Sequence, residues 1–147
     1  MSGKGFEKGV KIHHFLGRHS PDFAGDLAVG QTKMTINQRA LVHDVEVDVV
    51  CTGRLYDFIA RRDGRSGVVL GQPIYEIDRM KVVTPNQRIE LDETLLNQLP
   101  CGYRHLAYLQ SLIGYDVKKD MPGLTGPEVE ALYARGQAWL DGADSPF

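Results

Sequence analysis

The chain has 147 residues, the length of one ordinary domain and enough to bury a hydrophobic core. Its hydrophobic fraction of 42% and charged fraction of 24% are ordinary for a soluble globular protein. The net charge of −2 and the scattered basic residues exclude the positive surface that binds nucleic acid or an anionic membrane, and no apolar run is long enough to cross a bilayer.

The N-terminal residues 1–9 are polar and glycine-rich, without the apolar run of a signal peptide. We therefore expect a cytoplasmic protein whose two cysteines, Cys51 and Cys101, are free thiols. The next segment, Val10–Gly17, is a predicted strand that contains the pair His13-His14. Because successive side chains of a strand point to opposite faces, only one of these histidines can face an enclosed surface. A loop is predicted at Ser20-Pro21-Asp22.

Three longer strands follow, at Asp26–Leu41, Val45–Ala60 and Gly67–Met80. His43-Asp44 is a plausible tight turn between the first two of them. Asp63-Gly64 is a strong hairpin signal between the last two. Antiparallel strands joined by tight turns form a meander, and strands of this length predict strong curvature of the sheet.

Glycines inside the three long strands support this curvature, since a strand glycine often marks a bulge or a bend. They are Gly30, Gly53 and Gly71. A bent sheet has a concave face, and a concave face can hold a pocket.

Downstream of Pro85 the period becomes helical. Asp92–Leu99 is a short predicted helix that Pro100 stops, and Gly114 suits the end of a second helix that begins near Tyr103. In the second helix the residues of one face are Tyr103, Leu106, Ala107, Gln110 and Ile113. For the last helix, Thr125 and Glu128 have capping-box spacing, Pro127 fits the first turn, and Gly142 ends it. Its apolar stripe is Val129, Leu132, Tyr133, Gly136, Trp139 and Leu140, in which Tyr133 and Trp139 are predicted docking residues.

These elements predict an α+β fold in a single domain. Residues 1–85 form a strongly curved antiparallel sheet, a cone-like barrel, and residues 86–147 form a helical C-terminal extension packed on it. A sheet with an uncovered apolar face is an association surface, so we expect a homodimer or a higher homo-oligomer.

Histidine is the side chain best suited to general acid–base catalysis near neutral pH. Asp57 and Glu76 are the strand carboxylates that could orient an imidazole, whereas Asp78 and Arg79 are expected to form a solvated rim. The histidine spacing matches no metal site, so no metal is predicted.

Arg54, Tyr56 and Phe58 share one face of their strand by alternation. This face is either a surface stripe or a pocket wall that offers a cation to a developing oxyanion. The residues alone leave both interpretations open.

The order of motifs resembles the SnoaL-like members of the nuclear transport factor two-like superfamily. The histidine-bearing strand is followed by Gly53-Arg54-Leu55-Tyr56-Asp57, then Arg61-Arg62-Asp63-Gly64, then Tyr75-Glu76-Ile77-Asp78-Arg79. In the C-terminal part the similar segments are 102–108, 121–124 and 131–133. The chain departs from the family where Arg65-Ser66-Gly67 replaces the usual tryptophan, at Gly71, and in having only about nine residues before the matching strand.

The resemblance implies a cone-shaped α+β fold with an apolar pocket. It also implies proton transfer on a small hydrophobic molecule, as in polyketide cyclases and related dehydratases. By position in the run His14-Phe15-Leu16-Gly17, His14 matches the family's base, which an aspartate of an N-terminal helix orients.

The sequence therefore predicts a cofactor-independent lyase or isomerase. The catalytic residues would be His14, Asp57 and Arg54, and the ligand-binding residues Tyr56, Phe58, Phe15, Met34, Gln72 and Tyr75. The alternative is a non-catalytic ligand-binding or oligomerisation module of the same family. The expected partners are a small hydrophobic molecule and further copies of the chain, without a metal, nucleic acid or a membrane.

Overall fold

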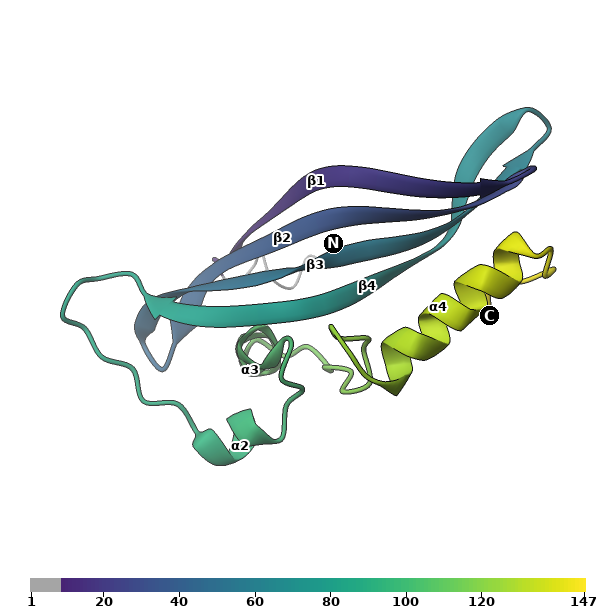
Figure 1. Cartoon of the computed structure of the whole chain (residues 1–147). Helices are drawn as coiled ribbons and strands as arrows, with labels where there is room; N and C mark the ends of the chain where they lie inside the picture. Colours follow the sequence, from purple (N-terminus) through teal and green to yellow (C-terminus); the bar gives the residue numbers. More distant parts are fainter. Residues whose placement is uncertain (1–8) are drawn as a thin grey trace. The chain divides into compact units, whose positions relative to one another are not determined.

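The computed structural model describes residues 9–147 and has an α+β fold (Figure 1). Four strands form one antiparallel sheet in the order β1-β2-β3-β4. The strands are β1 (Lys11–Ala24), β2 (Leu27–Val42), β3 (Val45–Arg62) and β4 (Arg65–Val82). The helices follow the sheet and are α2 (Glu93–Asn97), α3 (Arg104–Leu112) and α4 (Pro127–Leu140). The sheet is open, so β1 and β4 are its edges, and it is strongly curved only in part.

The contacts divide the chain into two compact units, and each strand contributes to both. Unit 1 contains the described residues up to Phe15, together with Thr35–Thr52 and Glu76–Asp120. Unit 2 contains Leu16–Met34, Gly53–Tyr75 and Met121–Phe147. No helix in the described part of the chain has the length and apolar character needed to span a membrane.

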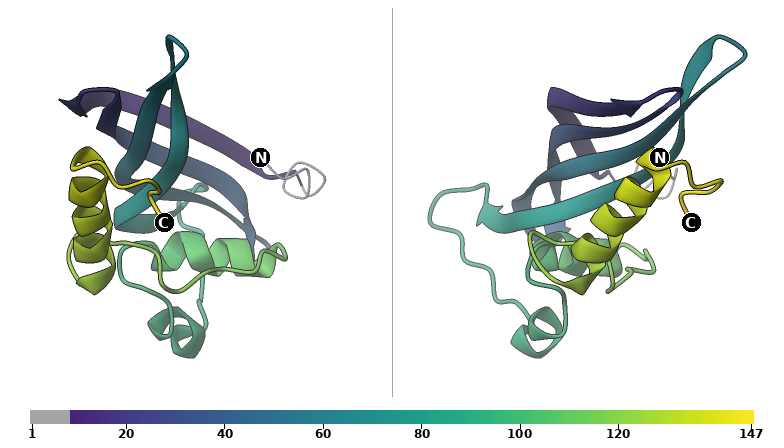
Figure 2. Two further views of the ribbon diagram at one scale, coloured as in Figure 1. Left: turned by 90° about the vertical axis from the view of Figure 1, so that its right-hand side faces the viewer. Right: turned by 45° about the vertical axis from the view of Figure 1, so that its right-hand side comes forward.

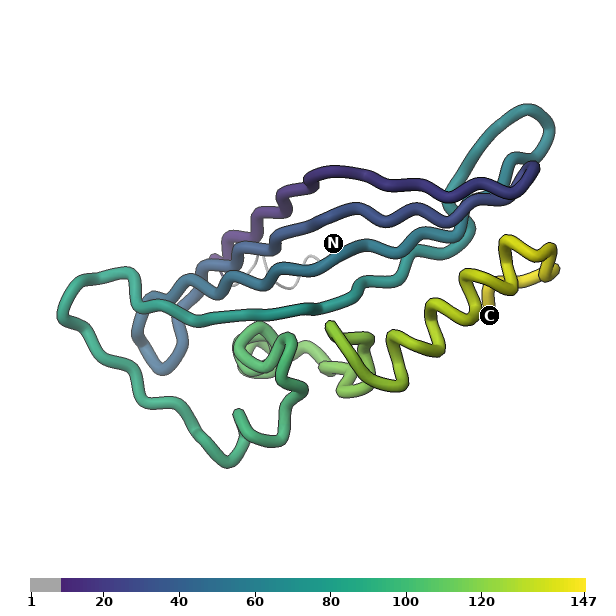
Figure 3. Tube along the Cα trace, in the orientation of Figure 1, coloured from purple at the N-terminus to yellow at the C-terminus, as the bar shows by residue number. Residues whose placement is uncertain are grey.

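Two-residue turns join the strands. Figure 3 shows the chain reversing direction between successive strands. The predicted turns are confirmed: His43 and Asp44 have φ of 49° and 62°, and Asp63 and Gly64 have φ of 51° and 74°. Positive φ at both central residues is the conformation of a type I′ hairpin turn. A third turn at residues 25–26, where Gly25 has a φ of 61°, was not predicted.

The predicted loop at Ser20-Pro21-Asp22 is wrong, because these residues belong to β1. Proline cannot donate a ladder hydrogen bond, which is why it usually breaks a strand. An edge strand needs donors on one side only, so β1 accommodates Pro21.

Unit 1 buries alternate residues of β2 and β3, and α3 lies beside this part of the sheet (Figure 1). The buried residues of β3 here are the odd-numbered Val47, Val49 and Cys51. From α3 the buried residues are Leu106, Ala107, Tyr108 and Leu109. Tyr103 and Leu106, which the sequence places on one face of this helix, are both almost fully buried.

In unit 2, α4 lies against the strands (Figure 2), and aromatic side chains form much of the core between them. Its buried cluster is Val29, Tyr56, Phe58, Ala60, Ile74, Val129, Leu132 and Trp139. The indole N–H of Trp139 donates to the carbonyl oxygens of Ala28 at 3.1 Å and Ile59 at 3.2 Å. The predicted docking role of Trp139 is therefore confirmed.

The buried face of β3 changes along the strand. Odd-numbered residues are buried from Val47 to Gly53, and even-numbered residues are buried from Tyr56 to Ala60. The two halves of the strand therefore bury opposite faces. A β-carbon at Gly53 would overlap the carbonyl oxygen of Ile74, so glycine permits a close backbone approach where the pattern changes.

The helix ends follow local chemistry. Asp92 caps α2 by accepting a hydrogen bond from the Leu95 N–H at 3.1 Å. The predicted capping box of Thr125 and Glu128 is wrong, because α4 begins at Pro127 after Gly126, which has a φ of 115° and no side chain to cap with. The predicted stops at Gly114 and Gly142 are confirmed by their positive φ.

Candidate functional site

The predicted site residues of unit 1 lie on β1. His14 and Phe15 are both exposed, and the Phe15 side chain is 62% exposed. His13 lines a shallow depression with Lys11, Ile12, Asn37, Arg39 and Asp48. Strand alternation directs the neighbouring His14 to the other face.

The structure brings together three predicted residues of unit 2 on one face of β3. Tyr56 and Phe58 are 5% and 0% exposed and belong to the core under α4, with ring centroids 5.5 Å apart. The Arg54 guanidinium lies over the ring of Tyr133, with 5.8 Å between its carbon and the ring centroid. Its Nη1 donates to Oε1 of Gln31 at 2.8 Å. Their predicted common face is confirmed.

The remaining predicted ligand-binding residues lie in the same unit. Met34 is buried, and its terminal methyl group lies close to Gly53. The Gln72 amide donates to the Pro73 carbonyl oxygen at 3.2 Å and approaches the sulfur of Met121. The Tyr75 N–H donates to the Pro122 carbonyl oxygen at 2.9 Å. Backbone pairing thus holds β4 to the segment that precedes α4.

Asp57 lies on the face of β3 opposite Tyr56. Its Oδ1 lies above Gly71, where a β-carbon would come within 2.9 Å of it. Burial raises the pKa of Asp57, and the nearby His19 lowers that pKa to a smaller extent. The His19 ring lies over Gly30, and its Nδ1 is 2.7 Å from Oγ1 of Thr32.

His19 was not predicted to accompany Asp57. The signal in the sequence was the pair of strand glycines, Gly30 and Gly71, which leave room for the His19 and Asp57 side chains. Both glycines were predicted to mark bends in the sheet.

A histidine and a carboxylate are directly hydrogen-bonded in unit 1. Nδ1 of His105 lies 2.8 Å from Oδ1 of Asp78, and the Asp78 side chain is only 1% exposed. The predicted position of Asp78 on a solvated rim is therefore wrong. The reason is that the start of α3 covers the end of β4, and residues 27 positions apart in sequence come into contact.

Asp78 occupies the place of a helix cap. Tyr103, the N-cap residue of α3, makes no side-chain capping bond. Oδ2 of Asp78 instead accepts the Leu106 N–H at 2.8 Å. A carboxylate is favourable there because the first turn of a helix has unpaired N–H groups and a positive dipole end. The His105 side chain itself is 26% exposed.

Cys51 lies near this pair but is not a nucleophile. Burial raises the pKa of the Cys51 thiol to about 12, and the charges of Asp78 and Glu76 contribute in the same direction. Its Sγ lies 3.8 Å from the carbonyl oxygen of Gly102. Cys51 and Cys101 are both free, as predicted. A protonated, buried thiol is chemically inert.

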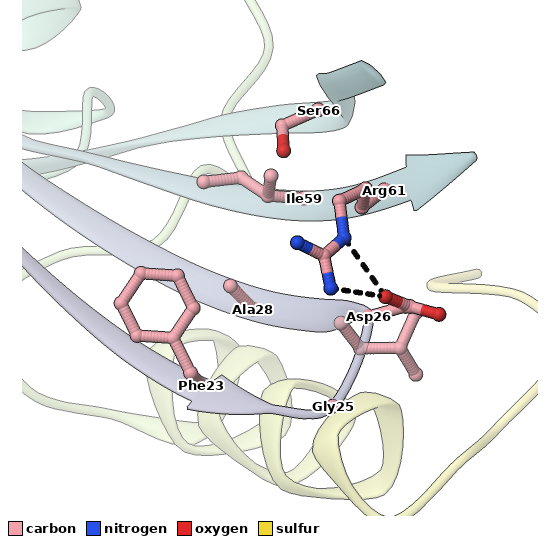
Figure 4. Close-up of a pocket in the computed structure, with 8 residues that line it drawn as sticks. Phe23, Gly25, Asp26, Ala28, Ile59, Arg61 and Ser66 are labelled. Carbon is pink, nitrogen blue, oxygen red and sulfur yellow. Dashed lines mark hydrogen bonds and ion pairs between the residues drawn. The ribbon is translucent and has the colours of Figure 1, made fainter. Parts of the chain in front are cut away.

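A depression of about 80 Å³ lies beside the β1–β2 turn. Arg61, which lines it, forms an ion pair with Asp26 at 2.8 Å (Figure 4). Both side chains are largely exposed, so this pair stabilises the unit little. No group of three metal-ligating side chains occurs among residues 9–147.

No family model matches the chain. It is 32% identical over 158 residues to an uncharacterised protein of Emericella nidulans, and this alignment covers 97% of this chain and 66% of that protein. It is 35% identical to a PEP2-like protein and 34% identical to pea pathogenicity protein 2, both of Fusarium vanettenii. Each of these alignments covers 96% of this chain and 65% of the relative. The chain thus spans just under two thirds of the length of these relatives, whose names state no reaction.

Proposed function

We propose that this chain is a cofactor-independent acid–base enzyme of the lyase or isomerase type, with a small hydrophobic molecule as substrate and His105 as the proton-transferring residue. The observation that carries the proposal is the 2.8 Å hydrogen bond between His105 Nδ1 and the buried carboxylate of Asp78. Buried carboxylates at this ring nitrogen are the usual partners of catalytic histidines.

The partner of Nδ1 determines the tautomer of the ring. When Nδ1 carries the hydrogen and donates it to a carboxylate, Nε2 has a free lone pair and can accept a proton. The carboxylate also stabilises the imidazolium ion that forms after proton transfer. His105 would therefore act through Nε2.

Asp78 is held in place on both oxygens. Oδ1 contacts His105, and Oδ2 accepts the N–H of Leu106. Both contacts lie at the start of α3, so the helix fixes the position of the carboxyl group. Such an anchored group can orient an imidazole without reorganising during the reaction.

The resemblance to SnoaL-like proteins supports the same class of chemistry, because a histidine oriented by an aspartate is the base in part of that family. The resemblance implies that His14 is the base, whereas the hydrogen bond with Asp78 favours His105 in that role. We also propose that the sheet takes part in a cone-like enclosure of the site, because proton transfer is favoured where water is excluded.

Turnover of small cyclic ketones, epoxides and hydroxylated aromatics by three single variants tests the proposal. His105→Gln is expected to lower kcat by about 10²–10⁴-fold, the usual contribution of a general base. His14→Gln tests the residue that the resemblance names, and His19→Gln is a matched control in unit 2. Full turnover by His105→Gln would contradict the assignment of the base.

A second candidate function is a non-catalytic binding or oligomerisation module. It is favoured by β1, whose residues are exposed on both faces apart from Ile12. The exposed apolar side chains of this strand are Phe15, Leu16 and Phe23, at 62%, 56% and 75%. Apolar surface of this kind favours association, so we propose a homo-oligomer. Light scattering should show that Phe15→Ser with Phe23→Ser lowers the mass of the assembly, and an unchanged mass would exclude this interface.

We also propose a cytoplasmic location, supported by the two free cysteines. The cytosol keeps thiols reduced, whereas oxidising compartments favour disulfides. Fractionation of cells that produce the chain tests this, with recovery in the soluble cytosolic fraction as the expected result.

A further inference from the structure

We propose that a depression in unit 2 binds the carboxylate or phosphate group of a small anionic molecule. The depression has a volume of about 410 Å³ and is lined by Arg18, Ser20, Gln31, Lys33 and Arg54. It does not depend on the proposed function, which rests on residues of unit 1.

The charged side chains that line the depression are all positive. Three neighbouring strands each contribute one cation, Arg18 from β1, Lys33 from β2 and Arg54 from β3. The other two lining side chains are a hydroxyl and an amide, and no carboxylate of residues 9–147 lines the depression. The whole chain has a net charge of −2, so this local excess of positive charge is a property of the site.

The Arg54 side chain is held in place by contacts with two neighbouring residues. Its Nη1 donates to Oε1 of Gln31 at 2.8 Å, and its guanidinium carbon lies 5.8 Å from the ring centroid of Tyr133. Tyr133 in turn packs against the buried Tyr56, with ring centroids 5.5 Å apart. A guanidinium held by two neighbours loses little conformational entropy when an anion binds. Its planar fork also matches the geometry of carboxylate and phosphate oxygens.

Asp22 of β1 and Asp57 of β3, which belong to the same unit, are not among the residues that line the depression. Asp57 follows Tyr56 and points to the opposite face of β3, towards Gly71. Asp22 lies further along β1, where its charge contributes to the raised pKa of Tyr56. The residues that line the depression would therefore offer an anion three cations and two neutral polar groups.

The size of the site indicates a small molecule as its ligand. Nucleic acids are bound by extended basic surfaces that contact many phosphates. Here three cations converge on one depression. A single oxyanion group attached to a small body fits this arrangement.

Titration calorimetry of the full chain at low ionic strength tests the inference with inorganic phosphate, with benzoate and with benzyl alcohol as the neutral analogue of benzoate. We expect saturable binding of an anion that weakens with added salt, and the tighter of phosphate and benzoate identifies the preferred group. Arg54→Gln should weaken binding about tenfold or more, the value of one charge-assisted hydrogen bond. Arg54→Lys should retain only part of the affinity because it lacks the fork.

Lys33→Gln and Arg18→Gln change exposed side chains and keep the test valid if Arg54→Gln fails to fold. Both should weaken binding, whereas Arg79→Gln, an exposed arginine of unit 1, should leave it unchanged. Equal affinity for benzoate and benzyl alcohol would overturn the inference. So would the absence of saturable anion binding, or wild-type affinity in the Lys33→Gln and Arg18→Gln variants.

Discussion

The hydroxyl oxygen of Tyr56 lies directly against Gly136 of α4, at a position where a β-carbon on residue 136 would overlap it. Both residues are buried in unit 2. Glycine is costly inside a helix, by about 1 kcal/mol relative to alanine. Its presence here lets α4 approach the strand closely enough to cover Tyr56.

Gly136→Ala is therefore expected to destabilise unit 2 by about 1–3 kcal/mol, the usual cost of overpacking a core, despite the better helix propensity of alanine. Thermal unfolding followed by the fluorescence of Trp139, the single tryptophan of the chain, measures the effect. Gly67→Ala is the matched control, because a β-carbon there meets no atom within 4 Å. Equal stability of the two variants would show that Tyr56 and Gly136 do not fit as described.

Asp78 should contribute to stability as well as to chemistry. Asp78→Ala removes the partner of the Leu106 N–H and of the His105 ring. The expected loss is about 2–3 kcal/mol, from a missing helix cap and an unsatisfied buried donor. Asp78→Asn retains an oxygen for Leu106 and should recover most of the loss in a chemical denaturation experiment. Comparable destabilisation by Asn and Ala would contradict the capping role.

The raised pKa of Asp57 gives a pH-dependent contribution to stability. Its folded pKa lies above the ordinary value of 3.8, so the folded state favours the protonated form. Stability relative to Asp57→Asn is therefore highest below that ordinary value and falls as the pH rises through the folded pKa. Denaturation across this range checks the sign, and a relative gain with rising pH would refute it.

His19 provides a second check on Asp57. The positive charge of His19 lowers the pKa of Asp57, so His19→Gln should raise that pKa further. Titration of the Asp57 carboxyl carbon by NMR compares the two proteins. An unchanged or lower pKa in the variant would mean that His19 does not influence the Asp57 carboxylate.

The two cysteines should differ in reactivity. Cys51 is buried with a thiol pKa of about 12, whereas Cys101 is exposed. One thiol per native chain should therefore react rapidly with Ellman's reagent at pH 8, and two after unfolding in guanidinium. Cys101→Ser should remove the rapid reaction. Two fast thiols in the native protein would contradict the burial of Cys51.

The sequence predicted the elements that local chemistry determines. Turns at His43-Asp44 and Asp63-Gly64, and helix stops at Gly114 and Gly142, depend on residues that tolerate positive φ. Burial of Tyr103 and Leu106 follows from helical period. Each of these signals lies within a few residues of the feature that it predicts.

Features that depend on distant contacts could not be predicted in the same way. From the sequence, Asp78 is predicted to be a solvated residue near the end of a strand. It is buried because α3 packs on β4. From the sequence, Pro21 is predicted to lie in a loop. A strand can accommodate this proline because β1 lies at the edge of the sheet. The pairing of His105 with Asp78 required both the order of the elements and the packing of the helix.

The acid–base proposal depends on a neutral His105 ring that carries its hydrogen on Nδ1. Long-range ¹H–¹⁵N NMR of selectively labelled histidine at pH 7.5, assigned with His105→Gln, tests this most directly. The account predicts a protonated Nδ1 and an unprotonated Nε2, with loss of this preference in Asp78→Asn. A ring that carries its hydrogen on Nε2 in the unmodified protein would contradict the account, because that nitrogen could then accept no proton from a substrate.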